Sequence, residues 1–154
     1  MKLFCLGVNH RTAPVDVRER LAFREEALAD ALRGLLEGGA VREAVIASTC
    51  NRVEVYGVAD DLDAGVREAI AFLGRWHEVE IEKHREHLYS LTALDAARHL
   101  FRVCASLDSL VIGEAQILGQ MKNAYRIGSE SGATGPTLNR VFHKAFTAAK
   151  RVRT

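Results

Sequence analysis

The chain has 154 residues, a formal net charge of +1, 48% hydrophobic residues and 27% charged residues. This length fits one globular domain, or one domain with a helical appendage. The near-zero charge excludes the bulk electrostatics of a non-specific nucleic-acid binder, but it leaves room for a local basic patch. No apolar run approaches the roughly 20 residues needed to span a bilayer, so no contact with a membrane is expected.

The three cysteines, Cys5, Cys50 and Cys104, are odd in number and form no C-x-x-C pair. This pattern is typical of a reducing compartment and predicts a cytoplasmic protein without a disulfide framework or a cysteine-based zinc site. The apolar start of the chain is too short for a signal peptide and runs directly into Asn9, so we interpret it as a first strand.

The first part of the chain is predicted to alternate between strands and helices. Apolar periodicity, with breaks at Gly and Pro, predicts strands over 2–9, 42–48, 52–59 and 87–91 and helices over 15–22, 24–36 and 62–76. The resulting order, βαββαβ, is that of the split βαβ or ferredoxin-like fold.

The rest of the chain is predicted to be helical. Thr92 and Asp95 match a capping box that opens a helix through Cys104. Two further helices are expected over 113–128 and 137–153 from their apolar spacing.

The fold class that follows is α+β, with a ferredoxin-like sheet and a C-terminal helical segment. We expect the ferredoxin-like core over 1–91 and the helical part of the same domain over 92–154. The last helix ends in a basic run at 150–153. Such an ending is typical of a solvated helix C-terminus, and it would also suit a boundary with a further domain.

The stretch STCNRVEVY at 48–56 joins two strand-like runs through a short polar segment that contains Asn51. This pattern predicts a strand–turn–strand with Cys50 near the tip of a tight connection. The neighbouring guanidinium of Arg52 would lower the pKa of the thiol, which favours the nucleophilic thiolate. The other interpretation makes Cys50 a small apolar residue at the edge of the core. This stretch alone leaves both open.

His99 is assigned to the polar side of the helix predicted over 92–104, together with Asp95 and Arg102. The apolar side is assigned to Leu94, Ala97, Leu100, Phe101 and Cys104. His99 therefore either points into water or lines a cleft that another part of the chain covers.

Gln116 and Gln120 are four residues apart, and Asn123 extends the same helix face. Uncharged amides in this arrangement can hydrogen-bond a polar substrate with defined geometry. An ordinary polar helix face is the alternative. His84 and His87 lie in a strongly charged stretch without a third ligand, so no metal site is predicted.

Three long stretches, in the same order, resemble glutamyl-tRNA reductase. They are GVNHRTAP at 7–14, STCNRVEVY at 48–56 and SLDSLVIGEAQILGQ at 106–120. The resemblance covers essentially the whole chain. It implies the N-terminal catalytic domain of an NADPH-dependent oxidoreductase, which catalyses the first step of tetrapyrrole (porphyrin) biosynthesis from glutamate. The family's NADPH-binding and dimerisation domains would follow this one, and no G-x-G-x-x-G follows a strand here.

The resemblance also implies a mechanism. Cys50 would attack the ester of glutamyl-tRNA, releasing tRNA and leaving a thioester, which hydride from NADPH would reduce to glutamate-1-semialdehyde. Arg52 would pair with the side-chain carboxylate of the substrate. His99 would be a second catalytic residue that polarises the carbonyl or supplies a proton. Glu114 would either engage the α-ammonium group of the substrate or orient Arg52.

The remaining substrate contacts are implied by matching positions. The implied substrate-binding set is Thr49, Asn51, Arg52, Ser109, Glu114, Ala115, Gln116 and Gln120. The implied partners are glutamyl-tRNA, a second copy of the full-length enzyme in a homodimer, and a downstream aminomutase. Without the cofactor domain, the chain would be limited to acylation of Cys50 and to esterase activity.

Two other functions stay open at this point. One is a tRNA- or partner-binding ferredoxin-like module in which Cys50 is structural. The other is a stand-alone thiol esterase. The reductase domain and the thiol esterase both require a single reactive thiol, whereas the binding module predicts three inert thiols.

Overall fold

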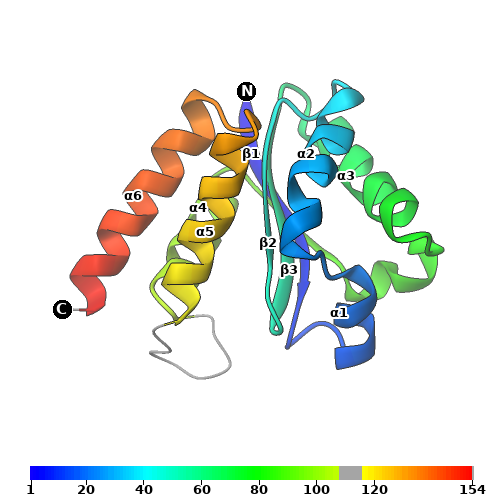
Figure 1. Ribbon diagram of the computed structural model, residues 1–154, viewed down its shortest axis with the longest axis horizontal. Coiled ribbons are helices and arrows are strands. Elements are labelled where there is room, and N and C mark those ends of the chain that lie inside the picture. The colour runs from blue at the N-terminus through cyan, green and yellow to red at the C-terminus, as the bar shows by residue number, and fades with distance from the viewer. Residues whose placement is uncertain (108–115, 154) are drawn as a thin grey trace.

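The computed structural model describes residues 1–107 and 116–153 and places a four-stranded sheet between two layers of helices (Figure 1). The strands are β1 (Lys2–Asn9), β2 (Glu43–Ser48), β3 (Arg52–Ala59) and β4 (Tyr89–Thr92). The α-helices and 3-10 helices are α1 (Val15–Leu21), η1 (Glu25–Ala27), α2 (Leu28–Glu37), α3 (Leu62–His77), η2 (Ile81–His87), α4 (Ala93–Cys104), α5 (Gln116–Glu130) and α6 (Pro136–Arg153). None of the described helices is both long and apolar enough to cross a bilayer.

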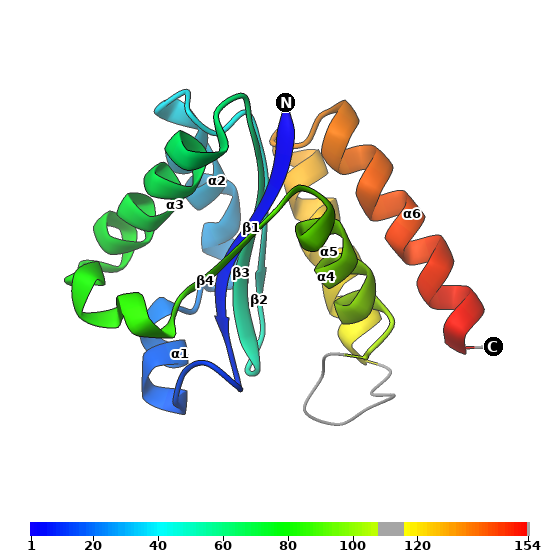
Figure 2. The ribbon, with the colours of Figure 1, turned by 180° about the vertical axis from the view of Figure 1, so that it is seen from behind.

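The sheet has the strand order β2-β3-β1-β4, and each neighbouring pair is antiparallel. Helices α1, α2 and α3 lie on one side of it, and α4, α5 and α6 lie on the other, as both views show (Figures 1 and 2). The hairpin turn between β2 and β3 and the C-terminal end of α6 lie at the same end of the molecule (Figures 1 and 2).

Both faces of the sheet are buried, because each is covered by a helical layer. Alternate residues of a strand point to opposite faces. Phe4, Leu6 and Val55 therefore pack with α2 and α3, whereas Cys5 and Tyr56 pack with α4, α5 and α6. Burial on both faces explains why β1 and β2 are almost continuously apolar in sequence between their end residues.

Helix α6 is anchored to the sheet by Glu43, which is buried at the start of β2. The carboxylate of Glu43 accepts hydrogen bonds from the backbone N–H groups of Gly135 and Leu138, both at 2.8 Å. These amides are at the N-terminus of α6, where the helix leaves them without an intrahelical partner and where negative charge is favourable. The orientation of α6 on the sheet is therefore fixed at its N-terminal end.

The mixed α/β class is confirmed, and the described helices and strands lie within a few residues of the predicted ones. The helix predicted over 113–128 corresponds to α5, and residues 113–115 lie outside the described part. Thr92 is the N-cap residue of α4, and the helix runs to Cys104 as predicted, but the capping box is wrong because Thr92 makes no side-chain cap hydrogen bond. Thr92 is also the last residue of β4, paired with Phe4, and Ala93 turns the chain into α4 with φ 51°.

Candidate active site

Cys50 lies at the tip of the turn that joins β2 to β3, as the sequence predicts. Ser48 pairs with Val53 at the end of the hairpin, and the Thr49 N–H donates to the Arg52 carbonyl at 2.8 Å. The hydroxyl oxygen of Thr49 also accepts the backbone N–H groups of Asn51 and Arg52, each at 3.2 Å. A hydroxyl that satisfies the backbone of its own turn restrains that turn. Thr49 therefore shapes the backbone on both sides of Cys50.

The three thiols have different surroundings. Cys50 is exposed, whereas Cys5 and Cys104 are buried. Burial, followed by the nearby charge of Glu54, raises the pKa of Cys5 well above its ordinary value and that of Cys104 to about 12. Both buried thiols are therefore protonated at neutral pH, so Cys50 is the thiol that a solvent-borne electrophile can reach.

Arg18 supports the turn from outside the hairpin. Its Nε donates to the carbonyl of Cys50 at 3.2 Å, and its Nη1 donates to the carbonyl of Ala13 at 2.7 Å. The bond to Cys50 ties α1 to the hairpin, the bond to Ala13 holds the guanidinium against the segment that precedes α1, and together they place a guanidinium beside the thiol-bearing residue. Sequence reasoning missed Arg18 because the contact joins residues 32 positions apart, which no local pattern reveals.

Arg52 faces the interior of the protein. Its side chain is 1% exposed, and its Nη1 lies 3.4 Å from Oε2 of Glu54. Residues Arg52, Glu54 and Tyr56 alternate along β3, so they share the face of the sheet that α4 covers. The guanidinium bonded to the turn is thus that of Arg18, while the guanidinium of Arg52 is engaged within the sheet.

Glu54 is the centre of a buried polar cluster. Tyr56 donates its hydroxyl to Oε1 at 2.7 Å, and Oε2 accepts from the hydroxyl of Tyr89 and bonds Nε2 of His99. Arg52 completes the set as the ion-pair partner. These partners come from β3, β4 and α4, so one carboxylate joins three elements. Hereafter the Glu54 cluster means Glu54, Arg52, Tyr56, Tyr89 and His99.

The partners keep Glu54 ionised. Burial alone would raise the pKa of its carboxyl, but the hydrogen bond and charge of His99, the charge of Arg52 and the hydrogen bond of Tyr89 together lower it to about 2. Burial and the negative charge of Glu54 raise the pKa of Tyr56 and of Tyr89. Both phenols therefore stay protonated and can go on donating to the carboxylate.

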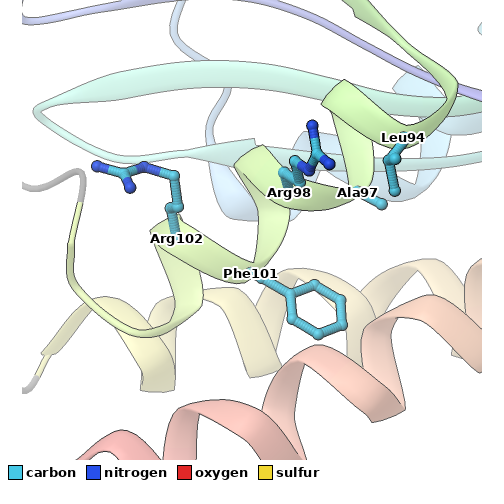
Figure 3. Close-up of a pocket in the computed structure, with 5 residues that line it drawn as sticks. All are labelled: Leu94, Ala97, Arg98, Phe101 and Arg102. Carbon is cyan, nitrogen blue, oxygen red and sulfur yellow. The ribbon is translucent and has the colours of Figure 1, made fainter.

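His99 faces the sheet, which corrects the predicted face assignment of its helix. The buried side of α4 is formed by Ala96, Leu100, Val103 and Cys104, and the His99 side chain beside them is 11% exposed. The opposite side carries Leu94, Ala97, Arg98, Phe101 and Arg102, which line a surface hollow of about 430 Å³ (Figure 3). The sequence pattern failed because Leu94 is 61% exposed, although it is apolar.

Thr49 and Gln120 lie in the wall of one cavity of about 200 Å³, between the hairpin, α5 and the segment around η1. Asn123 and Ser48 also line it, and Asn123 donates from its amide to a carboxylate oxygen of Glu25. Two members of the predicted substrate-binding set are therefore brought together. Gln116 is exposed on the first turn of α5 and is not among the residues that line this cavity. Three further members of the set, Ser109, Glu114 and Ala115, lie outside the described residues.

A thiol, a carboxylate and an imidazole also meet in the Glu54 cluster. One ligand atom each from Cys5, Glu54 and His99 lies within 4.8 Å of the others, a grouping that can hold a metal ion. However, the carboxylate is already bonded to two phenols and to His99, and the positive charge of Arg52 lies 3.4 Å away. We therefore interpret the group as a hydrogen-bonded network, since a neighbouring guanidinium repels a cation.

Comparisons with known proteins agree on one family. A family model described as "Glutamyl-tRNAGlu reductase, N-terminal domain" matches residues 6–154. Glutamyl-tRNA reductases of Pseudomonas putida (strain W619) and Pelobacter propionicus are 49% and 47% identical over the whole of this chain, which spans 36% and 35% of their lengths. The solved structure of glutamyl-tRNA reductase from Methanopyrus kandleri has a TM-score of 0.78 and 31% identity, covering 98% of this chain and 34% of that one.

Alkylation in the native state should separate the three thiols. We expect iodoacetamide to modify Cys50 alone, because Cys5 and Cys104 are buried and their thiol pKa values are raised. Peptide mapping by mass spectrometry gives the modified positions, and denatured protein should label at all three as a control. Labelling of Cys5 or Cys104 at the rate of Cys50 would contradict the assignment.

The ionised state of Glu54 should be visible in the pH dependence of stability. A carboxyl with a lowered folded-state pKa stabilises the protein above its unfolded pKa, and this contribution disappears as the pH falls through the folded value. The gap in unfolding free energy between wild type and Glu54→Gln should therefore narrow from pH 4.5 to pH 2, by on the order of 3 kcal/mol. Urea unfolding across this range measures the gap, and a gap independent of pH would show that folding does not lower the pKa of Glu54.

Proposed function

Since the chain belongs to the N-terminal domain family of glutamyl-tRNA reductase, we propose that it carries the step in which Cys50 takes the glutamyl group from glutamyl-tRNA. The observation that carries this proposal is an exposed thiol at the tip of a tight turn, restrained by Thr49 and by Arg18. A restrained, accessible nucleophile beside fixed hydrogen-bond donors is what acyl transfer requires.

The step is a transesterification without oxidation or reduction. The thiolate sulfur of Cys50 attacks the ester carbonyl carbon, a C–S bond forms, and the C–O bond to the terminal ribose of tRNA breaks. The ribose oxygen leaves as an alkoxide and takes up a proton, so the products are a glutamyl thioester and deacylated tRNA. A thioester is a good acceptor for a later nucleophile, whether hydride or water.

The residues around the turn have separate roles in this proposal. The Thr49 oxygen accepts two amides of the turn, which leaves its own proton to donate to a substrate in the cavity shared with Gln120. Asn51 contributes the backbone of the turn. The resemblance implies His99 as a second catalytic residue, but we assign it a positioning role, because its Nε2 bonds the carboxylate of Glu54. Glu54 in turn holds Arg52, the residue proposed to recognise the substrate carboxylate; because the side chain of Arg52 is only 1% exposed, this recognition requires the substrate carboxylate to enter the Glu54 cluster.

Hydride transfer is not assigned to the residues of this chain. The sheet of the described residues is antiparallel, and the sequence contains no G-x-G-x-x-G, so these residues do not form a dinucleotide fold. We infer that NADPH, the reductant in this family, binds to a part of the longer enzyme that these 154 residues do not include.

The finer architecture and the cellular setting are part of the same proposal. The strand order β2-β3-β1-β4, with helices between β1 and β2 and between β3 and β4, supports a ferredoxin-like core over 1–91. The shared packing of Tyr56, Leu100 and Phe142 supports the inclusion of 92–154 in the same catalytic domain. A homodimeric full-length enzyme, a downstream aminomutase and a cytoplasmic location remain predictions.

Intact-protein mass spectrometry after incubation with glutamyl-tRNA tests the acylation step. We expect one glutamyl adduct, mapped to Cys50 and labile to hydroxylamine, without NADPH. The Cys50→Ser variant should fold normally and form no glutamyl adduct, because a serine hydroxyl without a base is a poor nucleophile. Cys104→Ser serves as the control and should still form the adduct.

The outcomes separate the candidate functions. Deacylation of tRNA without an adduct, lost in Cys50→Ser, would indicate a thiol esterase with fast hydrolysis of the thioester. No adduct and no deacylation would contradict the proposal and favour a binding module, although the exposure of Cys50 argues against a structural role for this thiol.

Arg52 and Arg18 are two candidates for the contact with the side-chain carboxylate of the substrate, and lysine substitutions distinguish their roles. Arg52→Lys should raise KM for glutamyl-tRNA about tenfold. A planar guanidinium can bind the substrate carboxylate while it stays paired with Glu54, and a lysine ammonium lacks this forked geometry. Arg18→Lys should mainly lower kcat, since Arg18 bonds the backbone of Cys50. Single-turnover deacylation measures both constants. An unchanged KM in Arg52→Lys with a raised KM in Arg18→Lys would transfer the carboxylate contact to Arg18.

A further inference from the structure

Helix α6 carries an unusual concentration of positive charge. Its 18 residues contain five Lys and Arg and no Asp or Glu, although the whole chain has a net charge of only +1. Arg140, Lys144, Thr147 and Arg151 are spaced by four, three and four residues, so they fall on one face of the helix. All four are exposed. We call this row the α6 stripe.

The stripe points away from the protein because the other side of α6 is buried. Leu138, Phe142, Ala145 and Ala149 are fully buried against the cluster that includes α4 and α5. Together with the bonds from Glu43 to the N-terminus of the helix, this packing fixes the rotation of α6. The basic groups are therefore presented on a rigid element, so binding to them does not require the backbone to become ordered.

The C-terminal half of the stripe borders a surface hollow of about 320 Å³, lined by His143, Lys144, Thr147, Ala148 and Arg151. The Thr147 hydroxyl donates to the carbonyl of His143 at 3.0 Å, and Nε2 of His143 lies 3.2 Å from the hydroxyl of Tyr125. The hollow thus combines two cations with a hydroxyl and an imidazole, which are groups that bind phosphate oxygens.

The charge of α6 contrasts with that of α2 and α5. On those helices, cations stand beside carboxylates: Arg33 pairs with Asp30 at 2.8 Å and Arg126 with Glu130 at 2.7 Å. Such pairs neutralise the field of a helix surface. Helix α6 itself contains no acidic residue, so no such pair can form between two of its own side chains. A local positive potential on a nearly neutral protein favours a polyanionic partner.

We propose that the α6 stripe binds the sugar-phosphate backbone of the tRNA whose glutamyl end reaches Cys50. This inference rests on the proposed function. From Arg140 to Arg151 the helix rises about 16 Å, which is long enough to contact several successive phosphates of one strand. The C-terminal end of α6 and the hairpin turn lie at the same end of the molecule (Figures 1 and 2), so one tRNA can engage both. Such contacts hold the RNA without reading its sequence.

Charge reversal of the stripe tests the proposal. The triple variant R140E/K144E/R151E is compared with the control R33E/R67E/K83E, which changes the net charge equally on α2, α3 and η2. Deacylated glutamate tRNA is the probe, so thiol chemistry plays no part, and fluorescence anisotropy gives Kd at about 50 and about 200 mM KCl. We expect Kd to rise at least about tenfold in the stripe variant, with a salt slope lower by about 2 to 3, and to stay within about twofold in the control.

The outcomes decide the proposal independently of the acylation step. Native-state protection of Cys5 and Cys104 from alkylation checks the fold, and R140Q/K144Q/R151Q replaces the charge reversal if that check fails. Unchanged tRNA binding in the stripe variant, or no measurable binding by wild type, overturns the proposal. Polyglutamate serves as a second probe. If the stripe variant loses binding to polyglutamate but retains binding to tRNA, the proposal is overturned and the stripe is assigned to an acidic protein segment.

A short substrate separates this proposal from the proposed function. Glutamate esterified to the trinucleotide CCA should acylate Cys50 equally in wild type and in the stripe variant, because it is too short to reach α6. If neither protein is acylated while tRNA binding still depends on the stripe, the proposed function fails and the RNA-binding surface stands. If both are acylated and tRNA binding ignores the stripe, the surface fails and the proposed function stands.

Discussion

A buried, ionised carboxylate is the constraint around which the candidate site is built. Glu54 has no exposed surface, and it is stabilised by groups from three elements: Arg52 and Tyr56 on β3, Tyr89 on β4 and His99 on α4. Removing one partner of a buried ion pair costs about 3–5 kcal/mol, because the remaining charge loses its compensation. The Glu54 cluster therefore fixes α4 and β4 relative to the hairpin that carries Cys50.

The buried carboxylate and the exposed thiol are separate parts of the candidate site. Glu54, Arg52 and Tyr56 are fully buried, and low solvent exposure strengthens their electrostatic interactions. The thiol of Cys50 is exposed, on a turn whose backbone is held by Thr49 and bonded to Arg18. Under the proposed function, substitutions in the cluster should change how a substrate is held, whereas substitutions in the turn should change how the thiol reacts.

The sequence predicted the elements well and the polar contacts poorly, for one physical reason. Helices and strands follow from local apolar periodicity, and Cys50 at a hairpin tip follows from the polar gap between two strand-like runs. Glu54, by contrast, meets Tyr89 and His99 across 35 and 45 residues, and Arg18 meets Cys50 across 32. Alternation along β3 could have placed Glu54 and Tyr56 on the face of Arg52, but it could not identify the helix that covers that face. Leu94 shows the converse failure, since an exposed apolar residue biased the face assignment of α4.

The most direct test of this account compares two reactions of the same thiol in Glu54→Gln. Acylation of Cys50 by glutamyl-tRNA should slow at least about tenfold, because Arg52, the residue proposed to recognise the substrate carboxylate, loses its ion-pair partner. Alkylation of Cys50 by iodoacetamide should stay within about twofold of wild type, because the turn is intact. Protection of Cys5 and Cys104 verifies the fold, and Tyr89→Phe provides a milder variant. Acylation at the wild-type rate in a folded Glu54→Gln protein would contradict the account.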